Sequence, residues 1–536
     1  MKRRNFLAQT LAGGAALLAR SAMAQHAGHA MPSMTQMHGM GHAPAVVPVA
    51  PAPPPPPPAP LAAPDALPRG APLPDLFKLP NAPSDQTRPA RLFRAALAAQ
   101  PTTQTFINGK DTAMWQYTAG VTESPDGIAG PLIDVREGDR IEIRFDNRLP
   151  EPSTIHWHGL PVPPDQDGNP EDAVPPGAAR VYQFKLPPGS AGTYWYHPHP
   201  HMQTAEQVFH GLAGPIIVRA ADDPLAAWPE KHLFFTDLRL DVNGNIPPNG
   251  LEDWMNGREG QYVLINGALQ PEITVDGDQR WRVWNACSAR YLKLAFSDHR
   301  AFTQVGTDGG LLKRPIKGVR TLLLPPGARA ELIVHAGHAN SQAALMALAY
   351  NRGKMSMSGS VPAETDRVLA QVKFAPSAGG ERALPAWLRS IEPLGEPAAQ
   401  KTVMMTEQMD MQNMHAEGPM GLPSGMRFLI NNQLFDPQRV NMTSRRNEVE
   451  VWTVQNFTDM DHPFHIHGTQ FQVLDRKFEG KTVPEPFLAW RDTVNLRPNE
   501  VVRIATVQRM AGLRMFHCHI LEHEDLGMMA VLQVQG

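Results

Sequence analysis

The sequence predicts an all-β fold built from consecutive β-sandwich domains. From about residue 90 onward, short runs such as Ile141–Phe145 and Glu448–Trp452 alternate between apolar and polar residues, while helical periodicity is scarce. Alternation with a period of two is typical of strands that face a core on one side only. A chain of 536 residues is also too long for a single core.

Two repeated segments predict that there are three sandwiches. The first repeat is a strand that runs into an Asn, and its copies are GDRIEIRFDN (138–147), GDQRWRVWNA (277–286) and NEVEVWTVQN (447–456). The second is a Pro-containing turn that leads into a strand, and its copies start at Pro175, Pro325 and Arg497. With a Pro-rich stretch before residue 400 as the last linker, the predicted domains are 90–225, 226–389 and 390–536.

The N-terminal segment predicts an export signal. It begins with the basic pair Arg3-Arg4, continues through the apolar run Leu7–Leu18, and has small residues typical of a cleavage site at 22–24. The apolar run is shorter than the roughly 20 residues of a spanning helix, so a stable membrane anchor is disfavoured. Because the Arg pair and the following Phe-Leu are similar to a twin-arginine signal, we expect a signal peptide at 1–24, the twin-arginine export machinery as a partner, and a periplasmic location.

Residues 25–89 are predicted to form a disordered tail without a core. Residues 43–60 are almost all Pro, Ala and Val, which favours an extended polyproline spacer. Residues 26–42 mix His and Met with small residues. Two interpretations of that stretch remain open: a disordered tail, or a tail that collects copper, since imidazole and thioether suit both copper oxidation states.

Composition makes metal binding the first functional hypothesis. A net charge of −3 gives no basic surface for nucleic acid. The chain has 25 Met and 21 His but only two Cys, too few for a disulfide scaffold. Thioethers and imidazoles are ligands that suit copper.

Ten of the 21 His fall into four clusters at matching places in the first and third repeats. The clusters are HWH (156–158), HPH (197–199), HPFHIH (462–467) and HCHILEH (517–523). In a strand, residues i and i+2 point to the same side, so each HxH pair supplies two imidazoles. The second repeat has no His at the corresponding strand, which predicts a metal cluster shared between the first and third domains.

The residue types favour copper and indicate a second site. Imidazoles without clustered carboxylates disfavour calcium and magnesium, and the absence of CxxC pairs disfavours structural zinc. Cys518 lies between two of these His, so its side chain must point to the opposite face of the strand. With His462, His523 and Met528 it makes the ligand set of a blue-copper centre. Cys287 has no His nearby and is expected to be an ordinary core residue.

HWHG, HPH, HPFHIHG and HCHILEHEDLGM, in this order, resemble all four copper-binding motifs of the multicopper oxidases, over roughly residues 90–536. The resemblance implies three cupredoxin-like Greek-key sandwiches and four one-electron oxidations coupled to reduction of O2 to water. It also implies four copper ions: one type 1, one type 2 and two type 3. The implied ligands are His462, Cys518, His523 and Met528 for type 1; His156 and His465 for type 2; His158, His197 and His519 for one type 3 ion; and His199, His467 and His517 for the other.

The same resemblance points to two acids that would deliver protons to the cluster, Asp167 and Glu524. Cys518 would carry electrons from the type 1 site to the cluster. The alternative for either acid is an exposed loop carboxylate or an ion-pair partner. A perturbed pKa would favour the proton-relay role.

The electron donor is predicted from a Met-rich insertion at 404–426. Its seven Met are Met404, Met405, Met409, Met411, Met414, Met420 and Met426. Thioethers select Cu(I), so we expect a dock for cuprous ions, although a surface loop that covers a hydrophobic pocket is the alternative. Within the family, the segments around the last two His clusters, the insertion and the leader are most similar to bacterial periplasmic copper-efflux cuprous oxidases.

In those oxidases a substrate copper is bound near type 1 by Met and Asp residues, but Thr458 stands where an Asp is expected. The candidate residues here are Met409, Asp410, Met460, Asp459 and Asp461. The first alternative function is a laccase-like oxidase of phenols or other small aromatic reductants. The second is a copper-sequestering binding protein. An enzyme would consume O2, whereas such a binding protein would not. We expect a monomer.

Overall fold

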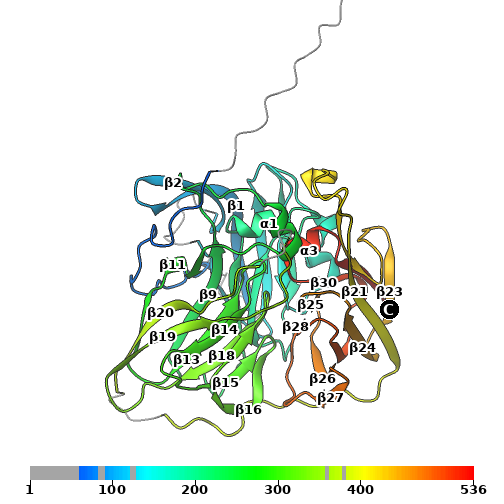
Figure 1. The fold of residues 1–536 in the computed structure, drawn as a ribbon. Coiled ribbons are helices and arrows are strands. Elements are labelled where there is room, and N and C mark those ends of the chain that lie inside the picture. Colours follow the sequence, from blue (N-terminus) through cyan, green and yellow to red (C-terminus); the bar gives the residue numbers. More distant parts are fainter. Residues whose placement is uncertain (1–58, 82–90, 121–127, 357–360, 377–381) are drawn as a thin grey trace, which may run out of the picture. The chain divides into compact units, whose positions relative to one another are not determined.

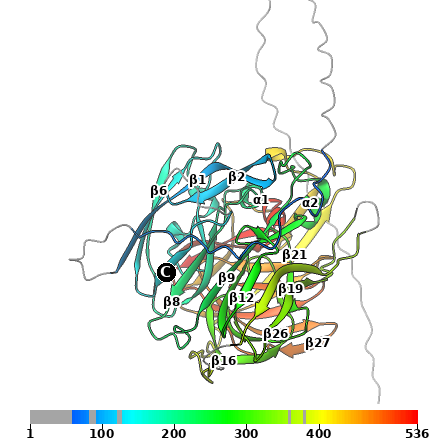
Figure 2. The ribbon, with the colours of Figure 1, turned by 90° about the vertical axis from the view of Figure 1, so that its left-hand side faces the viewer.

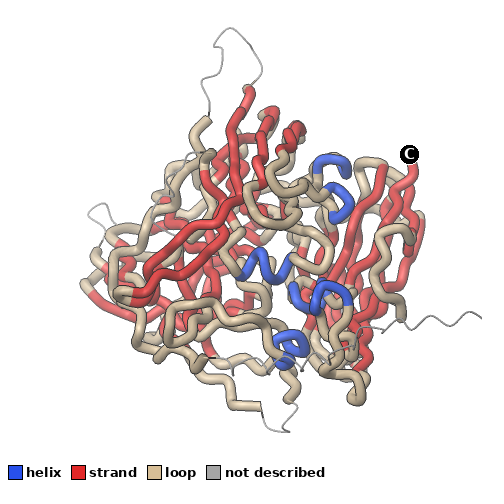
Figure 3. Tube along the Cα trace, turned by 90° about the horizontal axis from the view of Figure 1, so that it is seen from above, coloured by secondary structure: helices blue, strands red, loops and turns tan. Residues whose placement is uncertain are grey.

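The computed structural model describes residues 59–81, 91–120, 128–356, 361–376 and 382–536 (Figure 1). The predicted signal peptide and the His/Met stretch lie outside these residues. The described residues from 59 onward form one compact unit. In this described part, strands dominate and the helices are short, which confirms the predicted all-β class (Figure 3). No helix in it is long and apolar enough to cross a membrane.

The first sandwich has two four-stranded sheets, with the orders β2-β1-β4-β6 and β3-β8-β7-β5. Its strands are β1 (Leu92–Ile107), β2 (Lys110–Thr118), β3 (Ile133–Arg136), β4 (Arg140–Asn147), β5 (His156–His158), β6 (Ala179–Lys185), β7 (Gly192–His197) and β8 (Gly214–Arg219). Figure 2 shows β1 and β2, which pair in antiparallel fashion, next to each other. Inward-facing residues of both sheets, including Phe145, Trp157 and Tyr182, form one core.

The second sandwich has a seven-stranded sheet, β11-β10-β9-β13-β18-β15-β16, and a five-stranded sheet, β12-β20-β19-β14-β17. Its strands are β9 (Glu230–Leu238), β10 (Tyr262–Ile265), β11 (Ala268–Leu269), β12 (Glu272–Val275), β13 (Gln279–Asn285), β14 (Leu292–Phe296), β15 (Phe302–Thr307), β16 (Gly310–Val319), β17 (Leu322–Leu324), β18 (Arg329–Val334), β19 (Ser341–Leu348) and β20 (Arg367–Phe374). Cys287 is buried in the core of this sandwich, as predicted.

The third sandwich has a six-stranded sheet, β22-β21-β24-β29-β26-β27, and a five-stranded sheet, β23-β31-β30-β25-β28. Its strands are β21 (Ala399–Met409), β22 (Met426–Ile430), β23 (Val440–Arg445), β24 (Val449–Asn456), β25 (His462–Ile466), β26 (Phe471–Phe478), β27 (Lys481–Pro484), β28 (Thr493–Leu496), β29 (Val501–Val507), β30 (Gly512–Cys518) and β31 (Met529–Gln535). Helix α3 (Leu521–Asp525) contacts both α1 (Thr204–Phe209) and α2 (Leu251–Asn256), so one short helix of each sandwich meets near the end of β30. Figure 1 shows α1 and α3 near β30.

The sequence repeat is visible in the backbone hydrogen bonds. The Asn at the end of each of β4, β13 and β24 donates its backbone N–H to the backbone carbonyl of the residue just before β6, β18 or β29, respectively. These bonds are Asn147 to Ala178 (2.9 Å), Asn285 to Ala328 (3.1 Å) and Asn456 to Glu500 (3.1 Å). The three sandwiches therefore share one strand-and-turn unit, and strands β6, β18 and β29 begin at equivalent positions. The exact domain bounds stay a prediction.

The prediction that residues 25–89 form a tail without a core is wrong for residues 59–81. Leu61 and Pro72 form bridges with Asp241 and Glu272 of the second sandwich. Ala62, Leu67 and Leu79 are buried in hydrophobic clusters with residues of the sandwiches. The Pro-rich composition concealed these apolar residues, because Pro is compatible with an extended segment that lies along a sheet edge.

Candidate metal centres

Four strands place the HxH pairs. In the first sandwich β5 pairs with β7, so that His156 lies opposite His197. In the third sandwich β25 pairs with β30, so that His465 lies opposite His517. The residue between the two His of a pair, for example Trp157, faces the core of its own sandwich. The imidazoles therefore leave the cores on the other side of each strand.

The first and third sandwiches meet at these imidazoles. Nε2 of His199 lies 3.3 Å from Nε2 of His517, and Nδ1 of His158 lies 3.2 Å from Nε2 of His519. The rings of His156 and His467 stack with centroids 3.7 Å apart. All eight imidazoles are buried and form what we call the histidine cluster: His156, His158, His197, His199, His465, His467, His517 and His519.

Within the cluster, potential ligand nitrogens converge in groups of three. His199, His467 and His517 form one group, the same set that the sequence predicts for a type 3 ion. His156 and His465, the predicted type 2 ligands, form a second group together with His467. The predicted set for the other type 3 ion is not one compact group: His158 is close to His519, but the structure groups it with His156 and His197.

The hydrogen bonds of the imidazoles fit a metal. Nδ1 of His156, His197 and His465 donates to the backbone carbonyls of Asp167, Pro198 and Asp492 at 2.8–3.0 Å, so their Nε2 atoms carry lone pairs. These three Nε2 atoms are buried without a hydrogen-bond partner. An unsatisfied buried group costs about 1–3 kcal/mol, so a shared cation would stabilise a cluster of them.

His517 gives the clearest case. Its Nδ1 donates to the carbonyl of Cys518 at 2.9 Å, so its Nε2 presents a lone pair to Nε2 of His199 and of His467. Burial lowers the pKa of His517 to about 3, so the ring is neutral near pH 7. Neutral imidazoles with converging lone pairs are the donor set that copper prefers.

A second candidate site lies on the other face of β30. Nδ1 of His462 is 3.2 Å from Sγ of Cys518 and 3.3 Å from Nδ1 of His523, whose own distance to Sγ is 4.0 Å. Met528 is buried in the same core cluster as Cys518, and its backbone bonds to both Cys518 and His523. Burial raises the pKa of the Cys518 thiol, so a cation is needed to hold it as thiolate. The structure thus brings together three of the predicted type 1 ligands, His462, Cys518 and His523, and buries Met528 in the same core cluster as Cys518.

Groups around this second site fix its two imidazoles. Nε2 of His462 donates to Oγ1 of Thr458 at 2.8 Å, and Nε2 of His523 donates to the carbonyl of Met255 at 3.1 Å. Both Nδ1 atoms are therefore unprotonated and face the sulfur. Phe428 stacks on His523 with centroids 3.9 Å apart and holds the ring plane.

The two predicted acids lie against the histidine cluster. Asp167 is fully buried, with Oδ1 3.2 Å from Nδ1 of His156 and Oδ2 3.5 Å from Nδ1 of His467. Glu524 is also buried, with Oε2 3.1 Å from Nδ1 of His517 and Oε1 3.4 Å from Nε2 of His199. Burial raises the pKa of Glu524 well above its ordinary value, and the neighbouring Asp525 raises it further. Neither acid is an exposed loop carboxylate.

Sequence reasoning missed three residues that orient the ligands: Asp492, Thr458 and Met255. Oδ1 of Asp492 lies 3.0 Å from Nε2 of His158, and its backbone carbonyl accepts the bond from His465. Asp492 lies outside the repeated segments and has no His beside it in the sequence, so no local signal identifies it. Thr458 was noted only as the place of a missing Asp, and Met255 acts through its backbone, which residue type does not reveal.

Comparison with known proteins agrees with this site. Family models for multicopper oxidases match residues 108–223 and 397–536. The multicopper oxidase mco of Staphylococcus haemolyticus is 30% identical over 418 residues, which cover 76% of this chain and 82% of that protein. The laccase of Bacillus subtilis is 26% identical over 529 residues, which cover 86% and 97%, respectively.

Among solved structures, the multicopper oxidase from Campylobacter jejuni, described as a metallo-oxidase, is 42% identical with a TM-score of 0.82 and covers 90% of this chain and 98% of its own. The fold and the site thus define a copper-binding oxidoreductase that uses O2 as electron acceptor. The chain belongs to the multicopper oxidases.

Proposed function

We propose that this multicopper oxidase is a periplasmic cuprous oxidase, which oxidises Cu(I) for copper detoxification and reduces O2 to water. Four Cu(I) ions, one O2 and four protons would give four Cu(II) ions and two waters. The resident cofactors would be one type 1 copper at His462, Cys518, His523 and Met528, and one type 2 and two type 3 coppers in the histidine cluster. When bound, these ions supply the one-electron chemistry that the side chains lack.

The position of the Met-rich segment is the observation that carries this proposal. Met414 is buried in the core cluster that contains Cys518 and Met528, and Met409 packs against that cluster. Met411 and Met420 are 64% and 65% exposed. Exposed thioethers in a segment that packs against the core cluster of Cys518 and Met528 favour a soft metal ion as the electron donor. The similarity to the Campylobacter metallo-oxidase supports the same choice.

The loop in the structure is shorter than the predicted insertion at 404–426. Met404, Met405 and Met409 belong to strand β21, and Met426 begins β22, so only residues 410–425 form the connecting loop. Deletion of the whole predicted segment would therefore remove the second half of β21 and the first residue of β22. Substitutions on the face near the type 1 ligands test the proposal more cleanly.

The candidate acids for a substrate-copper site differ in their hydrogen-bond partners and in their exposure. The carboxylate of Asp461 accepts hydrogen bonds from Tyr350 and Asn495 at 2.6 Å, and that of Asp410 from Gln412 and Asn413. Asp459 is exposed, and Met460 beside it is buried.

Glu407, which sequence reasoning missed, is the acid best placed to take the role expected at position 458. It lies two residues before Met409 on β21, so both side chains point to the same side of the strand. Its Oε1 accepts the amide of Asp459 at 3.2 Å, while its Oε2 has no hydrogen-bond partner. Burial raises the pKa of Glu407. We propose Glu407 and Met409 as substrate-copper ligands.

We predict that the double variant Glu407→Gln, Met409→Leu raises the KM for Cu(I) by about tenfold, equivalent to ~1.4 kcal/mol of lost binding. Phenol oxidation should change by less than about twofold, because the type 1 ligands are untouched. Steady-state O2 consumption with each donor measures both. Met442→Leu is the matched control, since Met442 packs against the same core cluster from β23. Equal losses with both donors would refute the choice of substrate.

The alternative, a laccase-like oxidase, rests on the similarity to the Bacillus laccase. In that case the 410–425 loop would serve as a lid, and the double variant would leave both activities unchanged or raise phenol oxidation. Periplasmic location and twin-arginine export are tested separately, by fractionation of cells that carry Arg3→Lys, Arg4→Lys substitutions. We expect the unprocessed protein to remain in the cytoplasm of those cells.

A further inference from the structure

The second sandwich holds none of the proposed ligands, yet one of its turns contacts the histidine cluster. This turn, Pro325–Arg329, is the second copy of the Pro-containing repeat. Gly327 in the turn has φ of +83°, and a Cβ there would lie 2.9 Å from Cδ2 of His519. Only glycine combines this conformation with such a close approach to the imidazole. The turn is therefore fitted against the cluster.

Arg329, the first residue of β18, connects the turn to all three sandwiches. It is fully buried, and its Nη1 and Nη2 donate to Oδ1 and Oδ2 of Asp492 in the third sandwich at 2.6 and 2.5 Å. Its Nε donates to the carbonyl of Thr193 in the first sandwich at 2.8 Å. Its backbone amide donates to Oδ1 of Asp308 in the second sandwich at 2.7 Å.

Asp492 also contacts the histidine cluster. Oδ1 of Asp492, which Arg329 also binds, lies 3.0 Å from Nε2 of His158. A carboxylate at Nε2 fixes the tautomer of His158, so that Nδ1 carries the lone pair that faces His519. A carboxylate clamped by a bidentate guanidinium cannot rotate away from the ring, and its charge is compensated in a buried environment.

The three repeat copies show that this arginine is specific to the second sandwich. Strands β6, β18 and β29 begin at Ala179, Arg329 and Val501, directly after the residues that accept the equivalent backbone bonds. The first and third sandwiches supply the imidazoles and have small or apolar residues at this position. The copy without His has the arginine.

We infer that Arg329 is a positioning residue through which the second sandwich sets copper occupancy of the histidine cluster: it holds Asp492, and Asp492 orients His158. The inference rests on the proposed function for the placement of copper in that cluster. The second sandwich would thus take part in the metal site although it supplies no ligand.

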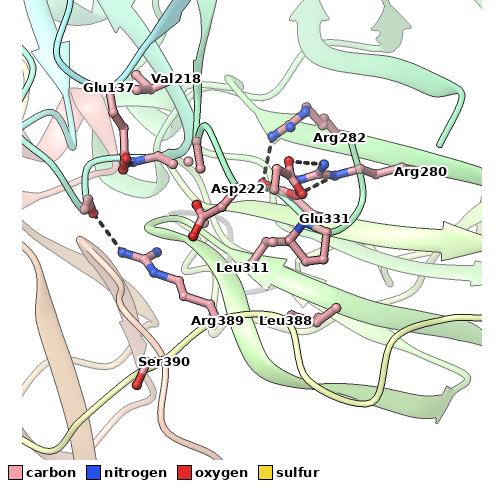
Figure 4. A pocket seen from close by; sticks show the side chains of 17 residues that line it. Glu137, Val218, Asp222, Arg280, Arg282, Leu311, Glu331, Leu388, Arg389 and Ser390 are labelled. Carbon is pink, nitrogen blue, oxygen red and sulfur yellow. Dashed lines mark hydrogen bonds and ion pairs between the residues drawn. The ribbon is translucent and has the colours of Figure 1, made fainter. Parts of the chain in front are cut away.

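The test compares Arg329→Met with Arg329→Lys and with Arg282→Met as matched control. Arg282 is equally buried and also joins the first and second sandwiches, through Thr193 and Glu331, but it has no contact with Asp492. Figure 4 shows it beside Arg280 and Glu331 at a pocket that Glu137 of the first sandwich also lines. The measurements are copper per chain after equilibration with a copper chelator, and the type 1 blue absorption.

In Arg329→Met, copper affinity of the histidine cluster should fall by about 10–100-fold while the type 1 absorption persists, as expected for loss of an outer partner of a ligand. Arg329→Lys should restore part of the affinity, because it keeps the charge without the bidentate geometry. Arg282→Met should retain all copper. Equal copper loss in Arg282→Met, or unchanged copper content in Arg329→Met, would overturn the inference.

Asp492→Asn provides a second route should Arg329→Met not fold, because its side chain keeps the same size. It should produce the same selective copper loss. The double variant Arg329→Met, Asp492→Asn should bind copper in the histidine cluster no more weakly than the more affected single variant. Losses that multiply would show independent roles and overturn the inference. A wild-type protein that holds only type 1 copper would instead refute the proposed function, and this inference with it.

Discussion

Substitution of Cys518 by Ser is expected to abolish O2 reduction with every electron donor. The thiolate is the ligand of the proposed type 1 site that gives the blue charge-transfer absorption, so its loss removes that absorption. Cys518 also lies between His517 and His519, and its carbonyl accepts the Nδ1 hydrogen of His517. The variant therefore interrupts the covalent route between the two sites, while the eight imidazoles keep their positions. Absorption spectra and O2 consumption measure both effects.

Cys287→Ser is the control for this variant. Cys287 is buried in the second sandwich, remote in sequence from any predicted ligand, so the blue absorption and turnover should persist. Burial of a hydroxyl there should lower the free energy of unfolding by about 1–3 kcal/mol. Turnover in Cys518→Ser, or loss of the blue absorption in Cys287→Ser, would contradict the assignment of the two cysteines.

For Glu524→Gln we expect O2 reduction to slow by roughly a hundredfold or more, the usual contribution of a positioned acid. Glutamine keeps the shape of the side chain beside Nδ1 of His517 and Nε2 of His199 but cannot give up a proton. Reduction of the type 1 site by Cu(I) without O2 should proceed at the wild-type rate, because that step requires no proton. Rapid mixing, first without and then with O2, separates the two steps.

Glu522→Gln is the matched control, since Glu522 lies on the same short helix and is equally buried. Its carboxylate faces Gly257 of the second sandwich rather than an imidazole. It should leave the O2 step within about twofold of wild type. If the two variants slowed that step equally, a general effect of helix α3 would account for the result better than proton delivery by Glu524.

Most of the candidate ligands could be predicted from the sequence because they follow strand periodicity. HxH pairs and a Cys between two His leave little freedom once the segments are strands, and the repeat assigns them to the first and third sandwiches. Asp167 and Glu524 could be proposed only from the family resemblance, because strand periodicity places neither of them beside the imidazoles.

The residues that orient the ligands could not be predicted, because their contacts join distant segments. Asp492 contacts His158 across 334 positions, and Arg329 contacts Asp492 across 163. Met255 takes part through its carbonyl, which any residue type provides. One signal was nevertheless present: Arg329 stands where the other two repeat copies have Ala179 and Val501. A comparison of repeats position by position finds it.

The proposed function depends on where copper binds. Anomalous diffraction at the copper edge from crystals of the copper-loaded protein locates the ions directly. The account predicts one ion among His462, Cys518 and His523, and three among the eight imidazoles between the first and third sandwiches. Crystals with no copper among those imidazoles, or with none beside Cys518, would contradict it.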